Sequence, residues 1–181
     1  MMGVKLMDIM FRKFEKNDID KFEYWYTDCT DWQKWDAPWE WVNYNFDRES
    51  QFEKRMKKTN SEPCFEYEII YNNEHIGWIS AYYMTNDFKW NGLTYTDKIA
   101  IGIDIPDTKY RGLGIGTQVY KKYLEYFRAL GYKEIHTQTW SGNAPMIKLA
   151  MSSGFKEVNR FVNLRIVGGK SYDALTFAIN L

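Results

Sequence analysis

The stretch Tyr110-Arg111-Gly112-Leu113-Gly114-Ile115-Gly116-Thr117 decides how this chain is interpreted. It follows a strand-like run over residues 98–105 and opens a helix-like run that extends to Leu130. Backbone N–H groups at the start of a helix lack an intrahelical acceptor and, with the positive end of the helix dipole, attract anions. The glycines let a bulky pyrophosphate approach those amides because no Cβ intervenes. The sequence therefore predicts a diphosphate-binding turn.

The two commonest nucleotide motifs do not match this turn. It lacks the G-K-[ST] ending of the phosphate loop of NTPases. It also differs from the G-x-G-x-x-G dinucleotide fingerprint, because Gly116 follows Gly114 by two residues rather than three. About a hundred residues precede the turn, whereas dinucleotide-binding folds usually carry their fingerprint on the first strand. The ligand is therefore expected to carry a diphosphate of another kind.

Two segments together resemble a known family. Arg111-x-x-Gly114-x-Gly116 after an apolar strand resembles the acetyl-CoA-binding motif of the GNAT N-acetyltransferases. Residues 143–155, Asn-Ala-Pro-Met-Ile-Lys-Leu-Ala-Met-Ser-Ser-Gly-Phe, are similar to the second cofactor segment of that family. Residues 10–20 and 169–173 resemble the subgroup of ribosomal-protein N-terminal (alanine/serine) acetyltransferases. The resemblance covers nearly the whole chain.

The resemblance implies a fold of the α+β class. We expect a GNAT-like acyl-CoA N-acyltransferase fold, with a mixed, mostly antiparallel sheet flanked by helices, in a single N-acetyltransferase domain over residues 1–181. A chain of 181 residues is long enough for one domain with a sizeable core.

Composition limits the function classes. The chain has 24 Lys+Arg and 24 Asp+Glu residues, and this zero net charge argues against nucleic-acid and membrane-surface partners. Two cysteines and two histidines form neither a disulfide framework nor metal-ligand spacing, so we expect no metal. No apolar run approaches the ~18 residues of a membrane span. We expect a cytoplasmic protein, with a homodimer left open.

The periodicity of apolar residues predicts the order β, α, α, antiparallel strands, α, β, α, β, β. Asn17 is expected to cap the first helix, and Asn72-Asn73 to turn a hairpin. The expected strands cover residues 4–14, 65–71, 75–83, 98–105, 134–140, 161–167 and 175–179. Four helices are expected: one after Asn17, one from about 48 to 58, one from about 114 to 129, and one after Asn143. Residues 30–42 are expected to form an ordered loop.

In the resembled family, the cofactor lies in a gap where two strands splay apart beside the glycine turn. Carried onto this chain, the resemblance implies that acetyl-CoA is the co-substrate. Arg111 would favour the phosphates by its charge, and the alternative for Arg111 is an ordinary surface arginine. Asn143 would face the pantetheine or the reacting carbonyl, and the alternative for Asn143 is a helix cap alone. The implied cofactor-binding residues are Ile103, Ile105, Arg111, Gly112, Leu113, Gly114, Ile115, Gly116, Thr117, Asn143 and Lys148.

Acetyl transfer to an amine needs three things: a deprotonated amine, a polarised thioester carbonyl, and a proton for the departing thiolate. A backbone amide near Ile103 could polarise the carbonyl. The chain departs from the family at two positions, because Ala150 stands where many members carry a tyrosine and Ala100 where many carry a glutamate. An ordered water could deliver the proton instead, since a thiolate is not a very basic leaving group.

Five polar residues are candidates for catalytic roles. Asp97, near the start of the strand, is the candidate base, and Asn143 is the third candidate catalytic residue beside Asp97 and Ser141. Ser141 and Tyr172 are possible hydroxyl donors. Asp104 is less suited, because alternation along the strand puts it on the face opposite Ile103.

A tryptophan-rich segment is the candidate acceptor site. Trp32, Trp35 and Trp39 could stack on a substrate or hold a cation by cation–π attraction. Asp31, Asp36 and Glu40 interleave with these tryptophans, which would suit a cationic amine.

The sequence thus predicts an N-acetyltransferase that moves an acetyl group from acetyl-CoA to a primary amine by direct attack in a ternary complex. The amine would belong to a protein N-terminus or to a small molecule. The departures at Ala100 and Ala150 keep open a catalytically weak acetyl-CoA-binding sensor or interaction module. An aromatic-rich carbohydrate-binding protein would explain the tryptophans but leave the glycine turn unexplained.

Overall fold

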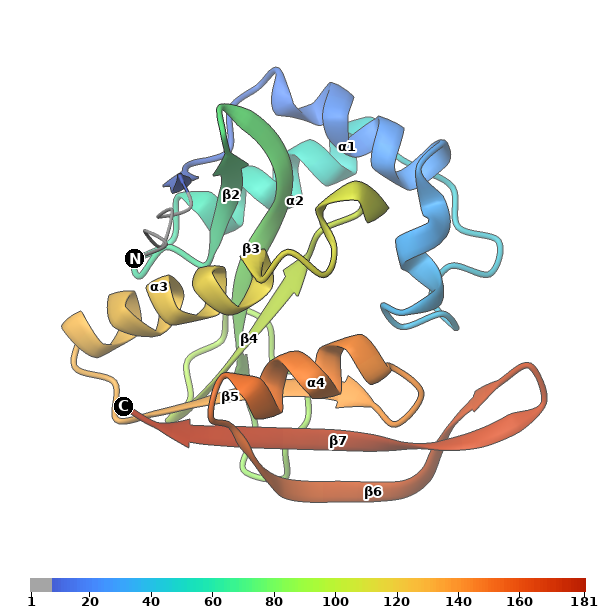
Figure 1. The fold of residues 1–181 in the computed structure, drawn as a ribbon, viewed down its shortest axis with the longest axis vertical. Coiled ribbons are helices and arrows are strands. Elements are labelled where there is room, and N and C mark those ends of the chain that lie inside the picture. Colours follow the sequence, from blue (N-terminus) through green and yellow to red (C-terminus); the bar gives the residue numbers. More distant parts are fainter. Residues whose placement is uncertain (1–7) are drawn as a thin grey trace, which may run out of the picture.

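The fold is a seven-stranded sheet with helices on both faces, seen in a computed structural model that describes residues 8–181 (Figure 1). The strand order is β1-β2-β3-β4-β5-β7-β6. The pairing of β4 with β5 is parallel, and the other pairings are antiparallel. The expected α+β class, with a mostly antiparallel sheet flanked by helices, is therefore confirmed.

The elements follow in the predicted order. The first half of the chain holds β1 (Ile9–Arg12), α1 (Asp18–Thr27), the 3₁₀ helix η1 (Thr30–Lys34), α2 (Arg48–Thr59), β2 (Glu66–Tyr71) and β3 (Glu74–Met84). The second half holds β4 (Lys98–Asp104), the 3₁₀ helix η2 (Thr108–Tyr110), α3 (Ile115–Ala129), β5 (Glu134–Trp140), α4 (Ala144–Ser152), β6 (Lys156–Val167) and β7 (Lys170–Asn180). Residues 4–7 of the expected first strand lie outside the described residues.

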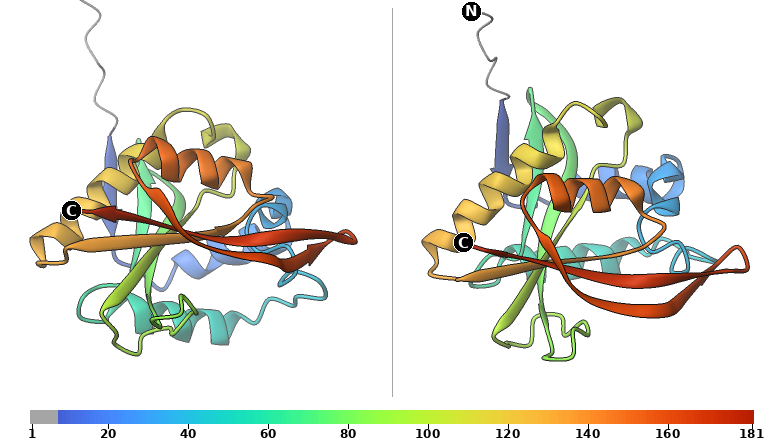
Figure 2. Two further views of the ribbon diagram at one scale, coloured as in Figure 1. Left: turned by 90° about the horizontal axis from the view of Figure 1, so that it is seen from below. Right: turned by 60° about the horizontal axis from the view of Figure 1, so that its bottom comes forward.

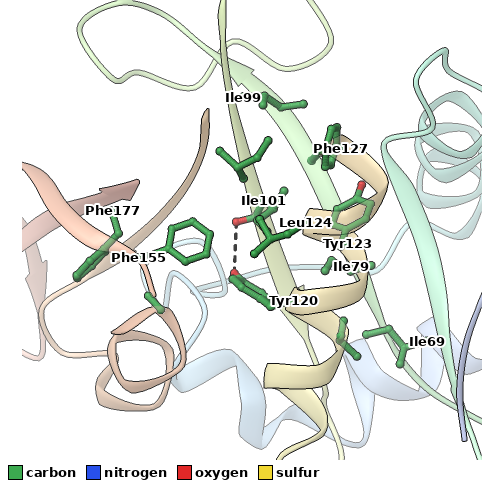
Figure 3. Packing of buried hydrophobic residues seen from close by; sticks show 14 of the residues in the cluster. Ile69, Ile79, Ile99, Ile101, Tyr120, Tyr123, Leu124, Phe127, Phe155 and Phe177 are labelled. Atoms are coloured by element: carbon green, nitrogen blue, oxygen red, sulfur yellow. Dashed lines mark hydrogen bonds between the residues drawn. The ribbon is translucent and has the colours of Figure 1, made fainter. Parts of the chain in front are cut away.

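Two hydrophobic clusters fill the two faces of the sheet. Trp78 and Ile79 are neighbours on β3, so their side chains point to opposite faces. Ile79 belongs to the larger cluster, which packs under α3 (Figure 3). Trp78 belongs to the smaller cluster, together with Phe22 and Trp25 of α1. Figure 2 agrees, with α3 and α4 on one side of the sheet and α1 and α2 on the other.

The local signals were mostly right. Asn72 and Asn73 both have positive φ, 49° and 64°, which is the conformation of the expected two-residue hairpin turn. Asn143 caps α4 by accepting a 3.0 Å hydrogen bond from the N–H of Met146.

The expected cap at Asn17 is wrong. Asn17 has helical backbone angles and its side chain makes no capping bond, whereas a capping residue normally has extended angles. The carboxylate of Asp18 accepts instead from the N–H of Glu15 and from the guanidinium of Arg12.

Two segments, residues 30–42 and the closing hairpin, differ from the predicted secondary structure. The expected loop over residues 30–42 contains the short helix η1. The closing hairpin is longer than predicted, since β6 begins at Lys156 and β7 at Lys170. Figure 2 shows this hairpin projecting past the rest of the sheet. No helix of residues 8–181 is long and apolar enough to cross a membrane.

Candidate active site

A gap opens between β4 and β5. The two strands start side by side but are paired at a single position, Ala100 with His136, and then run apart (Figure 1). Beyond that pair, the carbonyl of Ile101 accepts a 2.8 Å hydrogen bond from the Thr137 hydroxyl instead of a backbone N–H. The sheet is thus split at its centre from Ile101 onward.

Backbone groups of β4 line this gap. The carbonyl of Ile101 is directed toward β5, and alternate residues along a strand direct their polar groups to the same edge. The N–H and C=O of Ile103 therefore face the gap, and within residues 8–181 no β5 residue pairs with Ile103. Ile105 lies just past the end of β4, and its carbonyl accepts from Nε of Arg111 at 3.4 Å. The backbone of Ile103 thus remains unpaired on the side of β5, whereas the carbonyl of Ile105 is partly used within the chain.

The glycine turn lies between β4 and α3. Gly112 and Gly114 have φ of 74° and 79°, in the left-handed region that favours glycine. An added Cβ at Gly112 would meet no atom within 4 Å, so the turn is open on that side. The first helical bond runs from the N–H of Gln118 to the carbonyl of Gly114. For the amides of residues 112–117, residues 8–181 provide no acceptor, which leaves a cradle of free N–H groups.

Arg111, at the start of the turn, bonds to two other parts of the chain. Its guanidinium donates to the carbonyl of Pro106 at 2.9 Å and lies 3.4 Å from the carboxylate of Asp31 on η1. These bonds tie the segment after β4 to the tryptophan-rich segment. Arg111 is therefore more than an ordinary surface arginine, although its donors are directed to the chain itself.

Asn143 joins α4 to the tryptophan-rich segment. Its Oδ1 accepts from the N–H of Met146, and its Nδ2 donates to the carbonyl of Trp35 at 2.8 Å. The indole N–H of Trp140 donates to the same carbonyl at 2.7 Å. Both ends of the Asn143 side chain are thus engaged in holding this region together.

The remaining predicted residues lie just after β5, on β7 and on α4. Ser141 extends the pairing of β5 with β7, since its hydroxyl accepts from the N–H of Asp173 at 2.9 Å. Tyr172 packs its ring against that of Trp140, with 4.9 Å between centroids. Lys148 is exposed on α4.

The structure does not bring Asp97 to the gap. Asp97 is exposed before the start of β4 and its carboxylate lies 3.3 Å from the Tyr95 hydroxyl. It precedes Ile101 by four residues, which corresponds to about 13 Å along a strand, at the end of β4 remote from the glycine turn. The expectation that Asp97 is the base is therefore corrected, because strand length separates it from the gap.

Trp32 also needs correction as a substrate-binding residue. Its side chain is only 3% exposed, and its indole N–H donates to the carbonyl of Trp25. It packs against Trp41 and Trp78 in the smaller cluster. Trp32 is thus a core residue.

Trp35 and Trp39 are half-buried, and their segment faces the long hairpin. The guanidinium of Arg165 on β6 lies 4.5 Å from the ring centroid of Trp39. The rings of Trp39 and Trp140 meet edge to face at 6.0 Å. These contacts place the tryptophan-rich segment beside the open end of the gap.

The face of β4 opposite the larger cluster carries a site that sequence reasoning missed. Asp104 pairs with Trp78 and Gly102 with Ser80, and cross-strand partners share a face. An added Cβ at Gly102 would meet no atom within 4 Å, so space is open there, beside Asp104. Asp104 does lie on the face of β4 opposite Ile103, as the alternation predicted. That face also borders the gap, so its position does not exclude Asp104 from the site.

Two carboxyl groups lie close to one another at this face. Asp36 and Asp104 are half-buried, and neither side chain has a hydrogen-bond or ion-pair partner in the part of the chain that the structure describes. Burial, followed by the charge of Glu40, raises the pKa of Asp36 to about 6. Burial, followed by the charge of Asp36, raises the pKa of Asp104 well above its usual range. Lys54 acts on Asp36, and Arg55 and Lys58 act on Asp104, with smaller opposing effects, but none of these cations forms an ion pair with either carboxyl group.

A split sheet beside a glycine-rich helix start is the arrangement that the resemblance to the GNAT family implied, and comparison with known proteins agrees. Residues 8–156 match the acetyltransferase (GNAT) domain family. The chain therefore belongs to the GNAT acetyltransferases. A search of the curated proteins found no match.

Solved structures share the fold at low identity. The microcin C7 self-immunity acetyltransferase MccE, in complex with acetyl-CoA and AMP, is 19% identical, with a TM-score of 0.74 over 96% of this chain and 92% of that chain. An N-acetyltransferase from Staphylococcus aureus Mu50 is 19% identical, with a TM-score of 0.69 and coverage of 96% and 98%. The ribosomal-protein-alanine N-acetyltransferase from Brucella melitensis is 16% identical, with a TM-score of 0.68 and coverage of 95% and 99%.

Proposed function

We propose that this protein is an N-acetyltransferase that moves the acetyl group of acetyl-CoA to a primary amine. The observation that carries the proposal is the cradle of free amides over residues 112–117, which lies at the mouth of the gap between β4 and β5. The cradle suits the pyrophosphate of the cofactor. The free backbone groups of Ile103 suit the amides of an extended pantetheine arm, which would bind in the gap like an added strand.

The chemistry follows from the two sides of the gap. The amine approaches from the face that carries Gly102 and Asp104, where space is open. Its nitrogen attacks the thioester carbonyl directly, and the N–H of Ile103 polarises that carbonyl. Asp36, with a pKa of about 6, is suited to take up the proton that the amine loses. No metal is required for any of these steps.

The acceptor is a cationic amine in this proposal. Asp36 and Asp104 have no cationic partner among residues 8–181, so an ammonium group would supply one. The half-buried rings of Trp35 and Trp39 border the same region and favour cations. Both a protein N-terminus and a small-molecule amine meet this description, and the Brucella relative named above is of the first kind.

A second candidate is an acetyl-CoA-binding module without turnover. Ala100 and Ala150 are both fully buried and carry no group that can move a proton. Both ends of the Asn143 side chain are engaged within the chain. This candidate predicts cofactor binding at the same turn with no acetyl transfer to any amine.

The first test is a thermal melt with and without acetyl-CoA on the native chain and two variants. Gly112→Trp adds a ring at the cradle, whereas Gly131→Trp adds one at the far end of α3. Gly112 and Gly131 are matched, since both have positive φ, 74° and 88°, and open space around the missing Cβ. A ligand at a hundred times its Kd stabilises by about 2.7 kcal/mol.

We expect acetyl-CoA to raise the Tm of the native chain and of Gly131→Trp, but not that of Gly112→Trp. A native chain that melts cooperatively with no shift would contradict cofactor binding. Release of free CoA thiol in a panel of amines then separates the enzyme from the binding module, because only the enzyme releases CoA in proportion to acetylated amine.

A further inference from the structure

Two buried hydroxyl groups lie where the pairing of β4 with β5 ends. The Tyr120 hydroxyl, from α3, lies 3.0 Å from Oγ1 of Thr137 on β5 and 3.5 Å from the carbonyl of Ile101 on β4. Both side chains are fully buried. Figure 3 shows the Tyr120 side chain reaching from α3 to Ile101, with the dashed line marking that contact. The inner end of the gap is therefore marked by two hydroxyls.

The hydrogen-bond geometry leaves the Tyr120 proton available. The Thr137 hydroxyl donates to the carbonyl of Ile101 at 2.8 Å. A hydroxyl has one proton and two lone pairs, so Oγ1 of Thr137 can accept from Tyr120 at the same time. The Tyr120 proton can then turn to a ligand atom without breaking the bond that ends the strand pairing.

The surroundings of the Tyr120 hydroxyl suit a sulfur atom. It lies 3.9 Å from the sulfur of Met146, on the first turns of α4. Ala150 follows Met146 by one helical turn, so it lies on the same face of α4. Ala150 has no polar side-chain atom, which leaves Tyr120 as the hydroxyl that approaches this end of the gap from the helices.

The position of these groups matches the thioester end of the ligand. With the pyrophosphate at the glycine turn, the reactive end of an extended arm lies at the inner end of the gap. The distance from Ile101 to Ile105 is about 13 Å along an extended chain. The sulfur that leaves as a thiolate would then lie near Tyr120, and it requires a proton.

We infer that Tyr120, supported by Thr137, is the catalytic residue that protonates the departing CoA thiolate. The inference rests on the proposed function. The amine nitrogen bonds to the carbonyl carbon, and the C=O π pair moves to oxygen. When that pair re-forms the carbonyl, the C–S bond breaks and sulfur leaves with the electron pair of the C–S bond. Sulfur takes the proton of the Tyr120 hydroxyl. The ammonium form of the acceptor gives its first proton to Asp36 before attack, and after attack the nitrogen gives its second proton to water. The tyrosinate regains a proton from water when CoA departs.

Two features keep Tyr120 in its donor state between turnovers. Burial raises the pKa of Tyr120, so its hydroxyl remains protonated at neutral pH. When the proton leaves, the Thr137 hydroxyl can rotate from the Ile101 carbonyl to the tyrosinate oxygen and stabilise its charge. Thr137 thus acts as a positioning residue for Tyr120.

The test compares Tyr120→Phe with Tyr123→Phe. Both tyrosines lie on α3 and are fully buried, but the Tyr123 hydroxyl is 3.5 Å from the carbonyl of Cys64, away from the gap. Each variant removes one hydroxyl and keeps the ring. The kcat and the KM for acetyl-CoA and for an amine that the native enzyme acetylates are measured for both. Thr137→Val and Thr137→Ser are measured in the same way.

We expect Tyr120→Phe to lower kcat about 100-fold with the KM for acetyl-CoA unchanged, the scale of a lost acid catalyst. Thr137→Val should lower kcat less, Thr137→Ser should retain it, and Tyr123→Phe should leave it unchanged. Native kcat in Tyr120→Phe, or an equal loss in Tyr123→Phe, would overturn the inference alone. A native chain that acetylates no amine would overturn the proposed function, and this inference with it, before any variant is compared.

Discussion

The side-chain amide of Asn143 donates to the backbone carbonyl of Trp35 across 2.8 Å, which joins the start of α4 to the tryptophan-rich segment. Trp140 donates to the same carbonyl, so one oxygen anchors two contacts. A motif that suggests a cofactor role thus also carries a long-range structural bond. Asn143 therefore has two structural roles. It caps α4 beside the proposed cofactor site, and it holds the tryptophan-rich segment beside the proposed acceptor site.

A matched pair of variants separates the two bonds of Asn143. Asn143→Asp keeps the oxygen that accepts from Met146 but loses the donor to Trp35, whereas Asn143→Ala loses both. A helix cap and a single hydrogen bond each contribute about 1 kcal/mol. We expect urea unfolding to give a smaller loss of stability for Asn143→Asp than for Asn143→Ala. Equal losses would mean that the bond to Trp35 accounts for the whole effect.

Asp104→Asn should weaken binding of the amine and leave binding of acetyl-CoA unchanged. A hydrogen bond to a charged group contributes about 1.5–3 kcal/mol, so the KM for a cationic amine should rise about tenfold or more. Asp104→Asn should not destabilise the fold, because burial and the charge of Asp36 disfavour the charged form of Asp104 and asparagine is uncharged. Steady-state kinetics with each substrate varied in turn checks this. An equal rise in both KM values would instead indicate a distorted gap.

The affinity for the amine should depend on pH through Asp36. Its pKa of about 6 lies above the ordinary value, so the carboxylate is mostly protonated below that pH and charged above it. The KM for a cationic amine should therefore fall as the pH rises from 5 to 7. Asp36→Asn should abolish this fall, whereas Glu125→Gln, at an exposed position on α3, should keep it. A fall that persists in Asp36→Asn would assign the titration to another group.

The fold could be predicted because its signals are local. The Asn72-Asn73 turn and the Asn143 cap act over two to four residues, and alternation along β4 needs only the strand itself. The prediction of a helix cap at Asn17 was wrong, because a suitable residue type does not fix the backbone angles that a cap needs.

The site was harder to predict, because it depends on contacts far apart in the sequence. Trp32 looked like its neighbours Trp35 and Trp39, and only the packing of Trp41 and Trp78 around it makes it a core residue. No sequence pattern singled out Tyr120, which lies within the helix predicted over residues 114–129. Its hydroxyl is placed at the gap by contacts with Thr137 and Ile101, which lie on two different strands.

A buried ion pair supports the face of the sheet that carries the smaller cluster. Arg55 of α2 bonds to Glu66 of β2 at 2.7 Å, and both side chains are almost fully buried. Removing one partner of a buried pair leaves an uncompensated charge and costs about 3–5 kcal/mol. Glu66→Gln should therefore lower the free energy of unfolding by roughly this amount, measured by urea titration. Glu157→Gln, which breaks the exposed pair with Arg160, should change it little, and similar losses in the two variants would contradict this account.

The open space at Gly102 offers the most direct check on the acceptor side. An added Cβ there meets no atom within 4 Å, and the position faces away from the larger cluster, beside Asp104. Gly102→Val should therefore fold, since β-branched residues suit strands. Its side chain would fill space that the amine needs, so the KM for the amine should rise while the acetyl-CoA-dependent shift in Tm stays the same. If Gly102→Val lost the shift in Tm but kept the KM for the amine, the two faces of the gap would have to be exchanged in the proposed mechanism.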